Sequence, residues 1–338
     1  MNLPIIRSHE RMDYKRCPTK WYWAWRKGYV PVNETFGALA LGAWMHDALA
    51  TWYAPGTFRD GILSNNFSVL AEAAIYGAHQ NGAPDHVIEQ AEELAALGYI
   101  MAQRYEEHYA HDPHIKEVIQ AEIPLTFTFS DENGVFAEHR LKPDLLVRDR
   151  QDRIWIFEHK TAKTIRTSHL VIDDQARPYG AMAELALKNA GIISKRDHVH
   201  GIMYNFLRKA VPDGRPTNAQ GKYLNKDGTI SKTQPPPYFV RHPVLLTTAA
   251  KKQSLRRLQA ECALITATTN LLRKESDCWK YLPKTPHMSC PRFCQFFDMC
   301  VAHEDGTAIT EMARTMFRRR NPYDYGDSTD EIATFEMG

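Results

Sequence analysis

The chain has 338 residues, of which 43% are hydrophobic and 24% are charged, so it fits a globular protein and excludes wholesale disorder. Its formal net charge of +2 does not by itself indicate a nucleic-acid binder, and any basic surface must be local. The sequence has no apolar run of membrane-spanning length and no signal-peptide segment in residues 1–10, so we expect a cytoplasmic protein without membrane contact.

The N-terminal third of the chain is predicted to be helical. Apolar residues such as Leu39, Ala43 and Ala50 recur at the spacing of a helix. The predicted helices of this part span residues 7–29, 37–53 and 84–109.

Strands and helices are predicted to alternate in the rest of the chain. Apolar and polar residues alternate in the first of these strands, and the residues Asp131–Gly134 that follow it are typical of a hairpin turn. The predicted strands span residues 121–129, 135–148, 153–159, 199–207 and 238–244. The predicted helices span residues 168–189 and 247–274, and a long loop is expected at residues 211–237. This order favours an α/β fold with helices around a small mixed sheet.

Lysine and arginine are concentrated in a few segments, although the whole chain is nearly neutral. These clusters are Lys195–Arg196, Arg208–Lys209, Lys222, Lys226, Lys232, Lys251–Lys252 and Arg256–Arg257. Each cluster fits both a solvated polar face and a track for nucleic acid, and the sequence leaves both interpretations open.

Two carboxylates and a lysine are expected to meet on one hairpin. Folding the chain about its polar turn brings Asp144 almost opposite Glu158, at a Cβ separation of about 5 Å. Because side chains alternate along a strand, Glu158 and Lys160 share one face, whereas Phe157 and His159 share the other. Carboxylates this close repel each other unless a cation neutralises them, and hard oxygen ligands favour Mg²⁺ or Mn²⁺. On these two strands alone, a surface salt bridge is an equally good interpretation.

At this point the sequence resembles the PD-(D/E)xK nuclease superfamily, whose split motif matches Pro143–Asp144 and Glu158–Lys160. Downstream, Gln175 and Tyr179 lie one helical turn apart and resemble the Q-x-x-x-Y motif of RecB-type nucleases. Upstream, the helix that contains His46 resembles the G-x-x-x-H-x-x-L helix of the same group. The shared order and spacing of these motifs favour a nuclease over separate packing or capping roles.

Two neighbouring positions belong to the same comparison. Related enzymes often have an acidic residue near the position of Glu122, at the start of the first strand. They usually have glycine where Lys142 stands. We therefore expect either that the close backbone approach allowed by glycine is absent, or that Lys142 points toward a phosphate.

The resemblance implies Mg²⁺- or Mn²⁺-dependent hydrolysis of phosphodiester bonds in DNA. The implied metal-binding residues are His46, Asp144, Glu158 and, through its carbonyl oxygen, His159. The implied catalytic residues are Asp144, Glu158, Lys160, Gln175 and Tyr179. In this scheme Lys160 orients or deprotonates the attacking water, and Gln175 and Tyr179 position the DNA strand or the lysine.

The cysteines are distributed unevenly. Cys17 lies near the start of the chain, and Cys290, Cys294 and Cys300 lie close together near its end. Four thiolates suit either zinc or an iron–sulfur cluster. The arrangement resembles the staple of AddB-type and CRISPR-associated RecB-like nucleases, in which one N-terminal and three C-terminal cysteines bind a [4Fe–4S] cluster. The usual C-x2-C spacing is C-x3-C here, so Cys278 is an alternative ligand.

The resemblance implies one RecB-like nuclease domain over residues 1–310, with its core at about 37–245. Residues 14–25 and 278–302 are expected to form the iron–sulfur staple. The implied fold is a restriction-endonuclease-like α/β core whose helical N- and C-terminal extensions are joined by the cluster. Residues 311–338 are expected to form a mobile tail.

Single-stranded DNA or duplex ends are the implied substrate, and exonuclease action in recombination, repair or phage DNA metabolism is the implied role. The protein would then work in the cytoplasm of a bacterium or of a phage host. The sequence has no G-x-x-x-x-G-K-[ST] motif, so a helicase or strand-annealing partner would be a separate chain. The alternatives are a spacer-processing nuclease of CRISPR adaptation and a catalytically silent iron–sulfur DNA-binding subunit. A silent subunit is expected to have lost motif residues, and here every motif position is filled.

Overall fold

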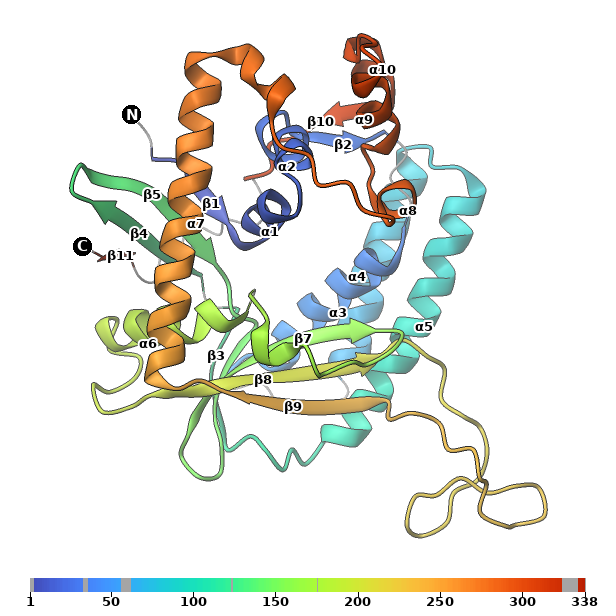
Figure 1. Ribbon diagram of the computed structural model, residues 1–338. Helices are drawn as coiled ribbons and strands as arrows, with labels where there is room; N and C mark the ends of the chain where they lie inside the picture. The colour runs from blue at the N-terminus through green and yellow to red at the C-terminus, as the bar shows by residue number, and fades with distance from the viewer. Residues whose placement is uncertain are drawn as a thin grey trace.

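A computed structural model describes residues 3–32, 36–55, 62–122, 124–174, 176–323 and 334–337 of the chain. At its centre lies a mixed five-stranded sheet, called the main sheet below (Figure 1). Its strands, in spatial order, are β3 (Glu117–Ala121), β6 (Leu145–Arg148), β7 (Ile154–Ala162), β8 (Val199–Arg208) and β9 (Phe239–Leu245). Strands β7 and β8 are parallel and the other neighbours are antiparallel. The parallel pair requires a crossover, which helix α6 (Ala176–Asn189) provides.

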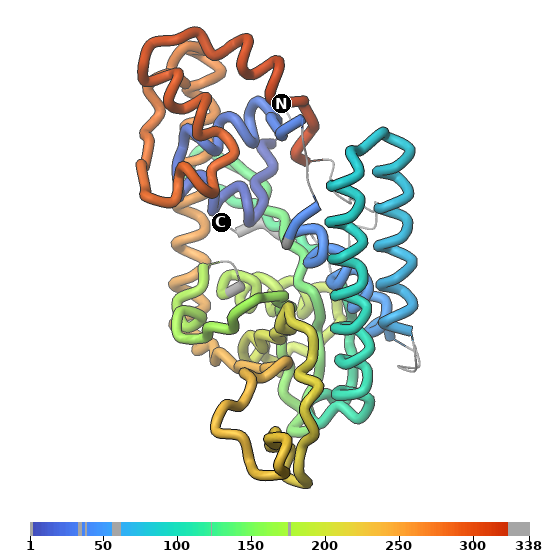
Figure 2. The backbone as a smooth tube through the Cα atoms, turned by 90° about the vertical axis from the view of Figure 1, so that its right-hand side faces the viewer, coloured from blue at the N-terminus to red at the C-terminus, as the bar shows by residue number. Residues whose placement is uncertain are grey.

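Two layers of helices cover the main sheet, as predicted for an α/β fold. One layer contains α3 (Ala38–Trp52), α4 (Ile62–Gln80) and α5 (Asp85–Tyr109), and the other contains α6, against which α7 (Thr248–Lys274) packs (Figures 1 and 2). Strand β7 contributes to both cores. Trp155 and Phe157 pack against the α3–α5 layer, whereas Ile154 and Ile156 pack into the core shared with α6 and α7. A central strand buried on both faces has to be almost wholly apolar, which explains the run Ile154–Phe157.

A smaller sheet lies beside the main sheet. Its strands, in spatial order, are β1 (Ile5–Arg7), β5 (Gly134–Leu141), β4 (Leu125–Asp131) and β11 (Thr334–Met337). The β4–β5 hairpin turns at Gly134, whose positive φ of 105° suits glycine, so the predicted turn at 131–134 is confirmed. Phe127, Phe129 and Ala137 of this hairpin join the same core as α7.

The single strand predicted at residues 135–148 is wrong, because the chain forms two strands in two sheets. Strand β5 ends at Leu141 and β6 begins at Leu145. Between them, Pro143 has no N–H for a ladder and restricts the residue before it, so the pairing is interrupted. Because of this interruption, Asp144 lies one residue before β6 and outside the continuous hydrogen-bond ladder.

Two other predicted elements also have different boundaries. The strand expected at 121–129 is split, because Glu122 has a positive φ of 49° between β3 and β4. The helix expected at 168–189 begins as a short 3-10 turn, η2 (Leu170–Ile172), before α6. Helix α4 is not among the predicted elements. By contrast, α3, α5, β8, β9 and α7 lie close to their predicted positions, and the side chain of Thr247 caps α7 as expected.

The long helix expected at residues 7–29 is broken at Cys17. The structure has α1 (Ser8–Arg16), α2 (Pro18–Trp21), the π-helical turn η1 (Tyr22–Arg26) and then strand β2 (Tyr29–Pro31). Cys17 is extended, with φ −165° and ψ 106°. The residue before a proline is disfavoured in the α region, so Pro18 explains the break. The break also frees the Cys17 side chain from a continuous helix surface.

The C-terminal part of the chain packs against the N-terminal part (Figure 2). It contains η3 (Ser276–Tyr281), α8 (Cys290–Phe293), α9 (Phe297–Glu304), α10 (Thr310–Met316) and β10 (Phe317–Arg319). Strand β10 pairs with β2, so the expected mobile tail at 311–338 begins with structured residues. Within the described ranges, no helix combines the length and apolar character that a bilayer crossing requires.

Candidate active site

Asp144 and Glu158 stand opposite each other where β6 begins. Leu145 pairs with Phe157 in the antiparallel register, so the next step of that register places Asp144 across from Glu158, as predicted. Both side chains are withdrawn from solvent, with Asp144 9% and Glu158 3% exposed. The main-chain N–H of His159 donates to Asp144 Oδ2 at 2.6 Å. This bond fixes the orientation of one carboxylate at the centre of the candidate site.

The two oxygens of Glu158 have different surroundings. Lys160 Nζ donates to Oε1 at 2.6 Å. Oε2 is buried and has no hydrogen-bond partner among the residues that the structure describes. An unsatisfied buried polar atom costs about 1–3 kcal/mol, and more when the group is charged. A cation bound beside Asp144 would remove this cost, so the site has the character expected of a metal-binding carboxylate pair.

Helix α3 brings His46 to the same place. A Cβ at Gly42 would lie 3.3 Å from the Thr161 hydroxyl, so the glycine lets α3 approach β7 closely. His46 follows one helical turn later on the same face. Its Nδ1 lies 3.6 Å from Asp144 Oδ1. The structure therefore brings together the histidine, both carboxylates and the lysine that the sequence predicts.

The charges in this site are strongly coupled. Burial works to lower the pKa of His46, but the Asp144 carboxylate outweighs it and raises the pKa to about 9. Burial also acts to raise the pKa of Asp144, but His46 and the His159 N–H hold it below its usual value. Glu158 behaves in the opposite way, because burial raises its pKa despite the nearby Lys160 ammonium. Asp144 is thus stabilised in its charged form by His46 and a main-chain N–H, whereas Glu158 is destabilised in its charged form and would gain from a metal ion.

The donor set matches a hydrated metal ion better than an enclosed one. In the part of the chain that the structure describes, no group of three or more His, Cys, Asp or Glu side chains is close enough to enclose a metal ion. Mg²⁺ commonly takes one or two protein carboxylates and keeps several waters. Asp144 and Glu158 fit that pattern, and neither needs a full cage of protein ligands.

The other predicted residues lie in different surroundings or outside the described residues. Gln175 lies outside the described residues. Tyr179 is 5% exposed and packs in the core between α6 and the main sheet. Glu122 lies next to the site, since its main-chain N–H donates to Asp144 O at 2.9 Å. Lys142 forms an ion pair with Glu122, so its ammonium group is directed at a carboxylate.

A buried polar network supports His159 from behind. Asn205 Nδ2 lies 2.9 Å from His159 Nδ1 and donates to the Tyr105 hydroxyl at 2.8 Å. Arg241 donates to Asn205 Oδ1 at 3.3 Å and to both Asp112 oxygens at 2.6 Å. Because arginine only donates, it turns the amide oxygen toward itself and the amide N–H groups toward His159. Burial lowers the pKa of His159 to about 3, so this ring is neutral and accepts at Nδ1.

The sequence prediction missed this network. Its available signal was a polar Asn205 inside the otherwise apolar run Met203–Leu207, together with Arg241 in the neighbouring strand. A buried polar side chain in a central strand needs partners, so such a residue indicates a network. The partner Asp112 lies in a connection between α5 and β3, and no sequence pattern links it to Arg241.

Four cysteines from the two ends of the chain line one cavity of about 680 Å³. Cys17 comes from the break between α1 and α2. Cys290 begins α8, Cys294 follows it, and Cys300 lies in α9. These are the four cysteines that the sequence resemblance singles out. The interruption of the helix at Cys17 and the short helix α8 both place thiols at this cavity.

Cys278 does not line this cavity. Its thiol donates to Glu275 at 3.2 Å in the exposed turn η3. Burial raises the pKa of the Cys294 and Cys300 thiols, although Lys20 acts to lower the first. The raised pKa values favour the protonated thiols over the thiolates. A bound metal ion would stabilise the thiolate form.

A family profile and two of the solved structures are similar to this chain. Residues 11–301 match the family profile described as the PD-(D/E)XK nuclease superfamily. The crystal structure of a proposed exonuclease from Eubacterium rectale is 11% identical and covers 86% of this chain and 92% of its own, with a TM-score of 0.41. The crystal structure of SSO0001 is 10% identical and covers 90% of this chain and 88% of its own, with a TM-score of 0.35. Curated protein sequences give no significant match.

Proposed function

The chain belongs to the PD-(D/E)XK nuclease superfamily, and we propose that it is a Mg²⁺- or Mn²⁺-dependent DNA nuclease acting as an exonuclease. One observation carries the metal-dependent chemistry. Asp144 lies opposite Glu158. Oε2 of Glu158 is buried without a hydrogen-bond partner in the described residues, whereas Oε1 accepts a hydrogen bond from Lys160. The salt bridge to Lys160 leaves the second oxygen of this buried carboxylate unsatisfied, and a bound cation would satisfy it.

Asp144 and Glu158 would hold the metal, with His46 and the carbonyl oxygen of His159 beside them. When bound, Mg²⁺ lowers the pKa of a water molecule and neutralises charge on the scissile phosphate. The His159 N–H holds Asp144 in place, and the network behind His159 keeps this ring neutral. The neutral His159 ring therefore adds no positive charge that would repel a bound cation.

Lys160 would orient the attacking water and stabilise the negative charge of the pentacoordinate phosphorus. Burial acts to lower the pKa of Lys160, but the Glu158 carboxylate raises it above its ordinary value. The lysine therefore stays protonated, which suits hydrogen-bond donation better than proton removal. The water oxygen would bond to phosphorus and release a proton to solvent, the ester P–O bond would break, and the leaving oxygen would take up a proton from solvent.

Gln175 and Tyr179 would position the DNA strand or Lys160. Tyr179 is packed in the core, so it would act by positioning α6 against the site. DNA is the proposed substrate, and a helicase or strand-annealing protein would act as a separate partner.

Cys17, Cys290, Cys294 and Cys300 would bind a [4Fe–4S] cluster that joins the two ends of the chain. The donors fit the group, because the four thiols line one cavity while Cys278 lies elsewhere. In a cluster each thiolate binds a different iron atom, so the thiols stand farther apart than around a single zinc ion. Within the described residues, these thiols are not close enough together to hold a single metal ion. Iron analysis and absorbance near 400 nm on anaerobically purified protein distinguish the cluster from zinc.

The nuclease proposal is tested with end-labelled single- and double-stranded DNA and anaerobically prepared protein. We expect Mg²⁺- or Mn²⁺-dependent shortening from the ends, with no cleavage of a closed circle. The Lys160→Ala variant should lose this activity, whereas Lys274→Ala, at the exposed end of α7, should keep it. DNA binding without cleavage by the wild-type protein would instead indicate the catalytically silent subunit.

A further inference from the structure

The connection between β8 and β9, residues 209–238, projects from the main sheet (Figure 1) and is called the arm below. A connection of this length without regular secondary structure is usually either disordered or functional. The arm is held by its own hydrogen bonds. Arg215 is paired with Asp213 and donates to Ser231 Oγ at 2.8 Å, and Gln234 bonds to the main chain of Tyr223. Such internal pre-organisation favours a binding role.

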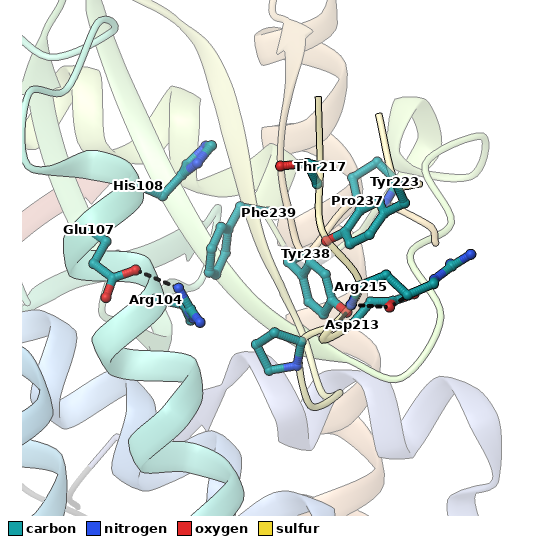
Figure 3. A pocket seen from close by; sticks show the side chains of 11 residues that line it. Arg104, Glu107, His108, Asp213, Arg215, Thr217, Tyr223, Pro237, Tyr238 and Phe239 are labelled. Carbon is teal, nitrogen blue, oxygen red and sulfur yellow. Dashed lines mark hydrogen bonds and ion pairs between the residues drawn. The ribbon is translucent and has the colours of Figure 1, made fainter. Parts of the chain in front are cut away.

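A cavity of about 620 Å³ lies between the arm and helix α5. Figure 3 shows Phe239 between the α5 side chains of Arg104 and His108 and the ring of Tyr238, with Tyr223 on the opposite wall. These rings offer flat apolar faces at a solvent-accessible position. Flat aromatic faces in a groove are the feature on which unpaired bases stack.

Cations reinforce these rings. The Arg208 guanidinium lies 4.1 Å from the centroid of the Tyr238 ring, and that of Arg215 lies 5.4 Å from the centroid of Tyr223. A guanidinium group over one face of an aromatic ring helps to fix the orientation of that ring.

The arm is also more basic than the chain as a whole. It contains five Lys or Arg residues against two Asp residues and no Glu, whereas the whole chain has nearly equal numbers. Arg215 is already paired within the arm, so the exposed lysines Lys222, Lys226 and Lys232 provide its positive field. A polyanion is the ligand that such a field attracts.

The root of the arm touches the strand that carries the catalytic residues. The Lys209 N–H donates to the carbonyl of Ala162 at 2.9 Å, two residues beyond Lys160 in β7. Phe239 packs with the α3–α5 layer, whereas Lys160 alternates toward the α6 layer. A DNA strand that binds at both the arm and Lys160 must therefore pass the end of β7 and β8. The arm would contact nucleotides several positions away from the scissile bond.

We propose that the arm and the adjoining face of α5 bind a single-stranded segment of the DNA substrate, with bases on Tyr223 and Tyr238 and phosphates on the arm lysines. This inference rests on the proposed nuclease function and adds to it a second contact with the same strand. It predicts that the site discriminates between long and short substrates, because a short one cannot reach the arm.

Binding is measured first, by fluorescence anisotropy of a labelled oligonucleotide of about 30 nucleotides with the Lys160→Ala protein and no divalent metal. Replacing Lys222, Lys226 and Lys232 by Glu should raise Kd about tenfold or more and reduce its salt dependence. Tyr223→Leu should raise Kd about fivefold, because one stacking face is lost while the main-chain bonds to Gln234 remain. Lys274→Glu, a single charge reversal at the far end of α7, should leave Kd within twofold and is compared with each single arm substitution. An unchanged Kd in the arm variants overturns the proposal.

Cleavage is measured second, with the same arm substitutions in an otherwise wild-type protein. The ratio of kcat/KM for an oligonucleotide of about 30 nucleotides over one of about four should fall about tenfold. Thermal melting verifies that the arm variants fold. If the wild-type protein cleaves DNA but this ratio does not change, the arm inference fails and the nuclease proposal stands. If it cleaves nothing while the arm variants still lose binding, the nuclease proposal fails and the arm is supported.

Discussion

The two chemically distinctive regions of this molecule are built in different ways. The carboxylate site comes from one hairpin, where Asp144, Glu158 and Lys160 are set by the pairing of β6 with β7. The cysteine cavity joins Cys17 to residues 290–300, so it exists only when the two ends of the chain meet. The first region depends on a local ladder, and the second depends on tertiary packing.

The packing that holds the cysteine cavity together is aromatic. The rings of Tyr22 and Trp279 stack at 5.5 Å with an interplanar angle of 5°, and Trp23 lies 5.6 Å from Phe296. The carboxylate site is held instead by main-chain pairing and by the buried network behind His159. A substitution in one region should therefore leave the other largely intact, and the following predictions test that separation.

The largest effect is expected from Glu158→Gln, which keeps the shape of the side chain but removes its charge. Cleavage of DNA should fall by about 10²–10⁴-fold, because the metal loses a charged ligand and Lys160 loses its partner. The protein should not lose stability, since a destabilised buried charge is removed. Steady-state cleavage and denaturant unfolding measure the two quantities. Glu311→Gln, on the exposed surface of α10, is the matched control, and full activity in Glu158→Gln would remove the residue from the mechanism.

The next effect concerns the network behind the site. Arg241→Leu leaves the buried Asp112 carboxylate without its two 2.6 Å hydrogen bonds, so the free energy of unfolding should fall by about 3–5 kcal/mol. The double variant with Asp112→Leu should recover most of this loss, because no buried charge is left unpaired. Urea unfolding of the single and double variants gives the comparison. Equal losses in both would show that packing of Arg241, and not its charge, stabilises the sheet.

The same contrast explains what could be predicted from the sequence. The pairing of Asp144 with Glu158 and the shared face of Glu158 and Lys160 follow from strand period and a turn, and the structure confirms both. The breaks at Pro143 and Glu122 were missed because alternating apolar residues continue across them. A proline inside a predicted strand was the available physical warning.

Long-range features were harder to predict. The partnership of Asp112 with Arg241 joins positions that no local period connects. Helix α4 was missed although Leu63, Phe67 and Ala71 recur at a spacing of four and are buried. The grouping of Cys17 with the C-terminal cysteines came from family resemblance, not from periodicity, and the shared cavity is compatible with it.

A smaller effect is expected from Cys17→Ser, which removes the only thiol that the N-terminal segment adds to the cavity. Bound iron should fall to background, and the free energy of unfolding of the anaerobic protein should decrease by about 3 kcal/mol. The carboxylate site should retain its metal-dependent activity once the variant is folded. Cys278→Ser is the matched control, because this thiol lies outside the cavity. Loss of iron in Cys278→Ser but not in Cys17→Ser would assign the ligands differently.

The smallest effect concerns the free energy of unfolding at acid pH. Each of the two sheets contains one buried histidine that contributes to it. Burial lowers the pKa of both His139, in the smaller sheet, and His159, in the main sheet, to about 3 from an ordinary value of 6.5. Above about pH 7.5 these rings are neutral in both the folded and the unfolded chain, so they contribute no pH dependence. As the pH falls from 6.5 toward 3, only the unfolded chain takes up the protons, and each histidine then destabilises the fold by about 1.4 kcal/mol per pH unit.

His139→Gln should therefore reduce the slope of unfolding free energy against pH between about 6 and 4 by about 1.4 kcal/mol per pH unit. The slope is the useful quantity, because any loss of packing shifts the whole curve without changing its steepness. His79→Gln, an exposed position on α4, should leave the slope as it is. If His139→Gln has the wild-type slope, His139 does not contribute to acid unfolding, and the pH dependence belongs to other titratable groups.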